Sequence, residues 1–185
     1  MKKINLFAAS VVTLFVFPAV AFVVGHFSDS FDYFSIFPDT FDWSSIAAGL
    51  GFGLLASGIG VLLLKAKIFK NVKSFYAQIF NDIEISLPDI IFYSLCAGIG
   101  EEIFFRGMLQ EFFGIWPIAI FFVLIHGYLS FKDWKKSIYG VFLILISAGF
   151  GYLYVYFDIY AAILAHAIYD VFMFKLLLNS QSKDS

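Results

Sequence analysis

Six apolar runs dominate this sequence, and they constrain its fold more than any other feature. A transmembrane helix needs about 20 mainly apolar residues to cross about 30 Å of hydrocarbon. Five of the runs approach or exceed that length, and the fourth is short. The runs are Ile4 to Gly25, Ile46 to Leu64, Ile90 to about Gln110, Trp116 to Ser130, Ile138 to Tyr156 and Ile159 to Leu178.

Composition agrees with a membrane protein. Hydrophobic residues make up 61% of the 185 residues and charged residues only 14%, whereas soluble domains carry about 25% charged residues. We predict an all-α, polytopic membrane protein with about six transmembrane helices, forming a single domain over residues 1–185. Such a chain is expected to contact the lipid bilayer and no nucleic acid.

The lysines predict the orientation of these helices. If six helices thread alternately through the membrane, every lysine falls on one side, and the loop with Asp29, Asp32, Asp39 and Asp42 falls on the other. The positive-inside rule makes the lysine side cytoplasmic. Both termini are therefore predicted to be cytoplasmic.

Several other segments have simpler interpretations. We expect the first run to be a retained helix, because it is longer than a signal-peptide core of 7 to 15 residues and lacks an obvious cleavage site. Residues 73–89 mix polar and apolar positions, which is typical of an amphipathic linking segment. Residues 179–185 form a polar tail, Cys96 reads as a small core residue, and His26 as a solvated one at the interface. Five glycines in the second run predict close helix packing: Gly49, Gly51, Gly53, Gly58 and Gly60.

Three charged residues lie where the bilayer should exclude them. Glu101 is about 16 Å along the helix that starts at Ile90, by a rise of about 1.5 Å per residue, so it lies near mid-membrane. A charge at that depth costs at least about 2.5 to 3.5 kcal/mol. Glu102 and Arg106 are four residues apart and can pair on one helical face. Glu101 points elsewhere and needs a partner from another helix.

Candidate partners occur on two later helices. His126 lies in the predicted fourth helix, and His166 and Asp170 lie four residues apart in the sixth. Each of these residues also has a structural interpretation: the Glu102–Arg106 pair can lock two helices together, and a lone histidine can be an interhelical hydrogen-bond donor. Together, two acids and two histidines on three intramembrane helices match what is needed to hold and activate a water molecule.

These motifs resemble those of a known family. "EEIFFRG" is similar to the EExxxR motif of the CAAX prenyl protease and bacteriocin-processing family, also called the Abi family of intramembrane endopeptidases. Phe122 to His126 matches its FxxxH motif, and His166 to Asp170 matches its HxxxN or HxxxD motif. The three motifs occur in the family's order. The resemblance, and the catalytic core that it implies, covers residues 88–178.

The resemblance implies a catalytic site made of Glu101, Glu102, Arg106, His126, His166 and Asp170. By position, Glu101 would activate the attacking water and His126 would help to place or deprotonate it. His166 and Asp170 would stabilise the oxyanion or complete the water site. Glu102 and Arg106 would orient the motif.

Two mechanisms stay open at this stage. We favour one with no cofactor, in which a glutamate activates water. A divalent metal is the alternative, with Glu101, His126, His166 and Asp170 as ligands of a zinc ion. The HExxH helix of familiar metalloproteases is absent from the sequence.

The expected function is hydrolysis of a peptide bond in or near the bilayer, in a membrane-associated peptide or protein substrate. We expect a multi-pass protein of the plasma (inner) membrane of a prokaryote. The alternative is a non-catalytic Abi-type immunity or regulatory scaffold, whose sequence signature would be a broken motif. A proton-coupled transporter is a third possibility, but the sequence has no inverted repeat.

Overall fold

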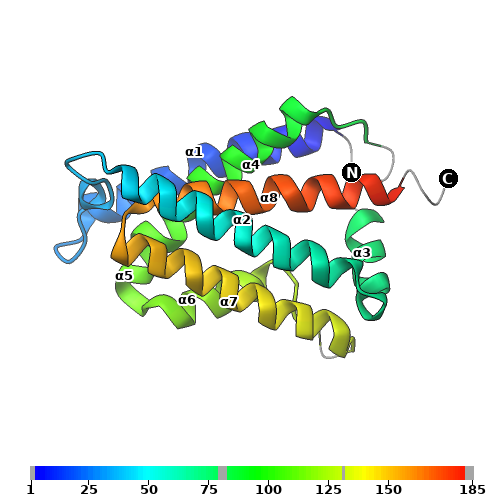
Figure 1. The fold of residues 1–185 in the computed structure, drawn as a ribbon. Coiled ribbons are helices and arrows are strands. Elements are labelled where there is room, and N and C mark those ends of the chain that lie inside the picture. Colours follow the sequence, from blue (N-terminus) through cyan, green and yellow to red (C-terminus); the bar gives the residue numbers. More distant parts are fainter. Residues whose placement is uncertain (1–2, 79–82, 131, 182–185) are drawn as a thin grey trace.

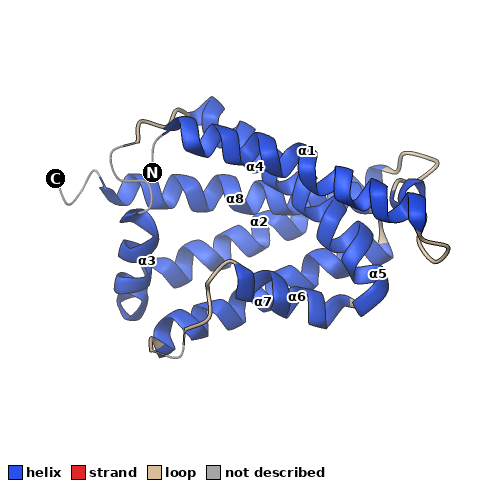
Figure 2. Cartoon of the chain, turned by 180° about the vertical axis from the view of Figure 1, so that it is seen from behind, coloured by secondary structure: helices blue, strands red, loops and turns tan. Residues whose placement is uncertain are grey.

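The computed structural model describes residues 3–78, 83–130 and 132–181, and these residues form helices and connecting loops with no strand (Figures 1 and 2). The predicted all-α class is confirmed. Four helices of the described part are long and apolar enough to cross a membrane. They are α1 (Lys3–Phe27), α2 (Trp43–Lys65), α7 (Trp134–Tyr156) and α8 (Ile159–Gln181).

The predicted third span consists of three consecutive helical pieces. These are α4 (Leu87–Glu102), a π-helical segment η4 (Ile103–Leu109) and the short α5 (Gln110–Phe113). Ser86 begins α4 through a capping box with Asp89, in which each residue bonds to the other's backbone. Gly114, with φ of 80°, ends α5, because a left-handed backbone suits glycine and stops a helix.

The predicted fourth span, Trp116 to Ser130, is wrong at its C-terminal end. Helix α6 covers only Ile115–Ile125, and the chain then runs as a non-helical connection towards α7 (Figure 2). Gly127 has φ of 71°. The amides of Gly127 and Tyr128 donate to the carbonyls of Leu124 and Val123, which is the Schellman arrangement that terminates helices. His126 therefore follows α6 instead of lying within it.

The positions of the helix ends agree with the lysine pattern, whereas the number of membrane spans stays a prediction. The start of α1, the helix α3 (Lys70–Ala77) and the end of α8 lie at one end of the molecule in Figure 1. The loop that holds η1 (Tyr33–Ile36) and the turn between α7 and α8 lie at the other end. The lysines after α2, which flank η2 (Lys67–Phe69), belong to the first end. Which end faces the cytoplasm stays a prediction. The predicted linking segment and the polar tail both lie partly outside the described residues, and Asn179 to Gln181 of the tail belong to α8.

Helix α8 packs between α2 and α4 (Figure 1), and small residues allow the close approach. A Cβ atom on Gly53 would lie 2.9 Å from the carbonyl oxygen of Ala165 on α8. On α4, a Cβ atom on Gly100 would collide with the carbonyl of Thr13 on α1. The expected packing role of the α2 glycines is confirmed for Gly49, Gly53 and Gly60, but Gly51 and Gly58 face open space.

The other expected core and surface positions agree with the structure. Cys96 is buried. His26 is exposed at the end of α1. Large apolar side chains such as Phe15 and Leu62 remain exposed on the outer faces of α1 and α2, as expected of surfaces that face lipid.

The glycine contacts predict a difference between two neighbouring positions on α2. Gly53→Ala should lower the thermal stability of the detergent-purified protein, because overpacking costs about 1 to 3 kcal/mol and the nearest atom is backbone. Gly51→Ala is the matched control, because its Cβ would meet nothing within 4 Å. Alanine is about 1 kcal/mol more favourable than glycine in a helix, so this variant should have an unchanged or higher melting temperature. Equal melting temperatures for the two variants would contradict this packing.

Candidate active site

Glu101 and Glu102 end α4 immediately before the π-helical segment, and they point in different directions. A π-helix hydrogen-bonds from i to i+5, and such segments occur frequently at functional sites. Glu102 is fully buried, whereas Glu101 lines a cavity. The predictions that Glu102 pairs with Arg106 on its own helical segment and that Glu101 faces residues of other helices are confirmed.

Glu102 connects two cations or potential cations in the interior. Its Oε2 lies 3.1 Å from Nε of Arg106, and its Oε1 lies 2.6 Å from Nδ1 of His166. Arg106 Nη2 also donates to the backbone oxygen and the hydroxyl of Ser147, at 3.1 and 2.8 Å. An ionised carboxylate can only accept a hydrogen bond, so Nδ1 of His166 carries a proton. The bond thereby sets the orientation of the ring.

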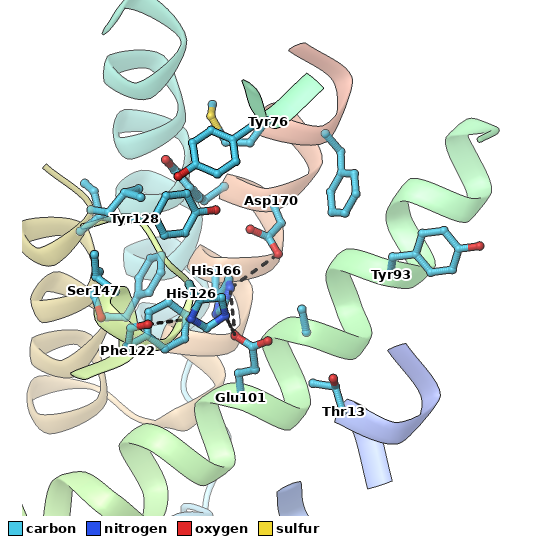
Figure 3. A pocket seen from close by; sticks show the side chains of 18 of the residues that line it. Thr13, Tyr76, Tyr93, Glu101, Phe122, His126, Tyr128, Ser147, His166 and Asp170 are labelled. Carbon is cyan, nitrogen blue, oxygen red and sulfur yellow. Dashed lines mark hydrogen bonds and ion pairs between the residues drawn. The ribbon is translucent and has the colours of Figure 1, made fainter. Parts of the chain in front are cut away.

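The other nitrogen of His166 faces the cavity (Figure 3). His166 Nε2 lies 4.0 Å from Oε2 of Glu101 and 3.6 Å from Oδ2 of Asp170. His126 Nε2 lies 3.8 Å from the same Glu101 oxygen. These distances are too long for direct hydrogen bonds, and polar groups at such separations are commonly bridged by water. The four side chains therefore surround one polar point.

His126 is held by the end of α6. Its Nδ1 lies 2.7 Å from the carbonyl oxygen of Phe122, which also accepts the backbone amide of His126 at 3.3 Å. The aromatic rings of Phe122 and Tyr128 lie near the imidazole of His126, with centroid distances of 4.3 and 6.3 Å. This bond directs Nε2 towards Glu101.

Helix α7 contributes residues that the sequence motifs did not reveal. The hydroxyl of Ser147 accepts a hydrogen bond from Arg106. The ring of Phe150 stacks on His166 at a centroid distance of 5.2 Å. The Arg106 guanidinium also lies over the rings of Phe122 and Phe150, at 4.9 and 5.7 Å. One weak signal was present, because the polar Ser147 interrupts the apolar run of α7.

A cavity of roughly 340 Å³ leads to these groups. Helices α4, α6 and α8 line it, and so do α1, α3 and α7. The lining residues of α1 lie in the first half of that helix, those of α4 run from Glu101 back to Tyr93, and the cavity follows α8 to Leu177. It therefore extends from Glu101 towards the end of the molecule where α3 lies (Figure 1).

The donor geometry does not favour a metal ion. In the parts of the chain that the structure describes, no group of three or more His, Cys, Asp or Glu side chains is arranged to hold one. Ligands of a tetrahedral zinc ion at about 2.1 Å lie roughly 3.4 Å apart, whereas the separations from Glu101 to the two histidines are 3.8 and 4.0 Å.

The structure thus brings together all six residues that the motifs predicted. Four surround the polar point at the base of the cavity: Glu101, His126, His166 and Asp170. Glu102 and Arg106 lie behind them, fully buried, and do not line the cavity. Glu102 contacts His166, and Arg106 contacts Glu102.

Comparison with known proteins gives one family and one relative. Residues 83–172 match the family model described as "Type II CAAX prenyl endopeptidase Rce1-like". The chain is also 31% identical over 86 residues to a protein of Bacillus subtilis (strain 168) named "Uncharacterized protein YpbD", an alignment that covers 46% of this chain and 43% of that protein. No solved structure gave a significant match.

The matched region contains each of the six site residues together with α4, α6 and most of α8. Helices α1 and α2 lie outside it. Residues 83–172, just under half of the chain, are thus similar to the Rce1-like family of type II CAAX prenyl endopeptidases.

Proposed function

We propose that this protein is an integral-membrane endopeptidase that hydrolyses a peptide bond at the base of the cavity. The observation that carries the proposal is the convergence of Glu101 with Nε2 of His126 and of His166, at 3.8 and 4.0 Å. A carboxylate and two imidazoles around one polar point supply both a base for water and donors for an oxyanion. The match of residues 83–172 to a model of CAAX prenyl endopeptidases supports the same conclusion.

In the proposed reaction, Glu101 accepts a proton from a water molecule as its oxygen attacks the carbonyl carbon of the scissile bond. The carbonyl oxygen becomes the oxyanion of a tetrahedral intermediate, and an imidazole N–H stabilises it. The C–N bond then breaks, and Glu101 returns the proton to the leaving amine. A carboxylic acid and an amine are the products.

Glu102 and Arg106 act through His166. The bond from Nδ1 to Glu102 fixes which face and which nitrogen of the ring meets the cavity. Arg106 balances the charge of Glu102, and it is itself tied to α7 through Ser147. Such supporting contacts hold a catalytic group in its productive geometry.

The proposed substrate is a membrane-associated peptide, with a prenylated CAAX peptide as the first candidate because of the family's description. The proposed site of action is the plasma membrane of a prokaryote. The cavity extends towards the end of the bundle where the described lysines cluster, which the positive-inside rule makes cytoplasmic. We therefore propose that water and peptide enter from the cytoplasmic side.

We expect Glu101→Gln to lower the cleavage rate by about 10²- to 10⁴-fold, the usual effect of losing a general base. The measurement is hydrolysis of a quenched fluorescent prenylated CAAX peptide by the protein in nanodiscs. The conservative variant keeps the shape of the side chain, so folding should be unaffected. Full activity in this variant would favour a non-catalytic scaffold.

The neighbouring substitution, Glu102→Gln, should change stability as well as rate. It leaves the charge of the buried Arg106 unpaired, and breaking a buried ion pair in this way costs about 3 to 5 kcal/mol. We expect a clear fall in the melting temperature, in contrast to Glu101→Gln. Similar melting temperatures for these two isosteric variants would show that the buried pair does not stabilise the helices.

A mechanism without a metal cofactor predicts that chelators leave activity intact. Dialysis against EDTA and treatment with 1,10-phenanthroline should leave peptide hydrolysis unchanged, and elemental analysis should find less than one equivalent of zinc per chain. Loss of activity that added Zn²⁺ restores would instead support the metal alternative.

A further inference from the structure

The cavity wall also carries polar side chains outside the motifs, and one of them lies on a helix that precedes the matched family region. Tyr76 belongs to α3, and its side chain lines the same cavity. Figure 3 places Tyr76 on the far side of Asp170 from Glu101. The region that matches the family model begins only at residue 83, so the motif analysis could not have found this residue.

Tyr76 is fixed by aromatic packing. Its ring lies 4.9 Å from the ring of Tyr128, which in turn stacks on His126. The ammonium group of Lys136, at the start of α7, lies 4.2 Å from the ring of Phe75 and 5.5 Å from that of Tyr76. Cation–π contacts of this kind hold α3 against α7. The phenol is therefore held in place before any ligand binds.

The hydroxyl of Tyr76 lacks a partner, although the side chain is only 8% exposed. It makes no hydrogen bond with any of the residues that the structure describes. Nearby, the hydroxyls of Tyr139 and Tyr169 bond to each other at 3.1 Å. Buried polar groups are normally bonded, and leaving one unpaired costs about 1 to 3 kcal/mol. Burial also raises the pKa of the Tyr76 phenol above its ordinary value, so the hydroxyl is protonated and can donate.

An extended peptide in this cavity would need donors of this kind. Each residue of the peptide carries a backbone carbonyl that loses water on entry and must find a replacement donor. The groups around Glu101 serve the scissile bond, and carbonyls further along the chain need others. A lipid chain carries no such carbonyls and would gain nothing from a hydroxyl there.

We propose that Tyr76 is a substrate-binding residue, whose hydroxyl donates a hydrogen bond to a backbone carbonyl of the peptide held between Glu101 and α3. This inference rests on the proposed function, because it takes the ligand to be a peptide. It assigns to α3 a part in recognition that lies outside the family motifs.

Binding can be measured apart from cleavage in the Glu101→Gln background. A fluorophore-labelled prenylated CAAX peptide is titrated with this variant in nanodiscs, and its anisotropy gives the Kd. Adding Tyr76→Phe should weaken binding by about three- to tenfold, the value of one hydrogen bond. In the protein with Glu101 intact, the same substitution should raise KM by a similar factor and leave kcat nearly unchanged.

Two controls separate recognition from packing. Lys136→Gln removes one contact of α3 but keeps the Tyr76 hydroxyl and its ring packing on Tyr128, and Tyr160→Phe removes a hydroxyl on α8 outside the cavity. Both should leave the Kd within about twofold of the background. A loss from Lys136→Gln equal to that from Tyr76→Phe would overturn the proposal, because the position of α3 would then explain both.

The outcomes also distinguish this inference from the proposed function. Unchanged binding after Tyr76→Phe, with cleavage by the intact protein, would refute the role of Tyr76 and leave the peptidase proposal standing. Binding that depends on Tyr76, without any cleavage by the intact protein, would support the role of Tyr76 and refute the peptidase proposal. Failure of the peptide to bind any of the variants would contradict both.

Discussion

The buried ion pair between Glu102 and Arg106 is the interaction on which the rest of the site depends. Both side chains are at most 1% exposed and lie in a segment surrounded by apolar residues, where an unpaired charge is very costly. The pair is linked to α8 through His166 and to α7 through Ser147. One network therefore fixes the relative positions of three helices and, with them, the imidazole that faces the cavity.

Close backbone contacts make this network possible. Helix α8 approaches α2 at Gly53, and α1 approaches α4 at Gly100, only because neither glycine carries a side chain. In a bilayer, where lipid competes for apolar surface, such small-residue contacts and buried polar bonds are what hold helices together. The same helix can thus carry both kinds of residue. On α4, Gly100 packs against α1, and Glu102 contacts His166.

The family match and the cavity do not have the same extent. Residues 83–172 supply Glu101, His126, His166 and Asp170 at the base of the cavity, but α1 and α3 form part of its wall. The three sequence motifs contain the polar groups that are proposed to hydrolyse the peptide bond. The wall decides what reaches them, and in this chain it includes Tyr76, which precedes the matched region. Substrate selection can therefore differ between relatives whose motifs are the same.

The sequence by itself determined the class of fold and the members of the site. Apolar run length predicts membrane helices, because the bilayer sets the length of a span. The spacing of Glu102 to Arg106 and of His166 to Asp170 predicts pairs on one face, because helical periodicity is local. The same local rule left Glu101 without a partner and so predicted a contact with another helix, which the structure confirms.

Tertiary structure decided what local patterns do not encode. The π-helical segment after Glu102, the contact from Arg106 to Ser147 and the place of Tyr76 in the cavity wall all depend on how helices distant in sequence are rotated and shifted against one another. That register arises from packing over the whole bundle. The end of α6 before His126 is an intermediate case, because Gly127 was a readable stop signal that the hydrophobicity of the surrounding run obscured.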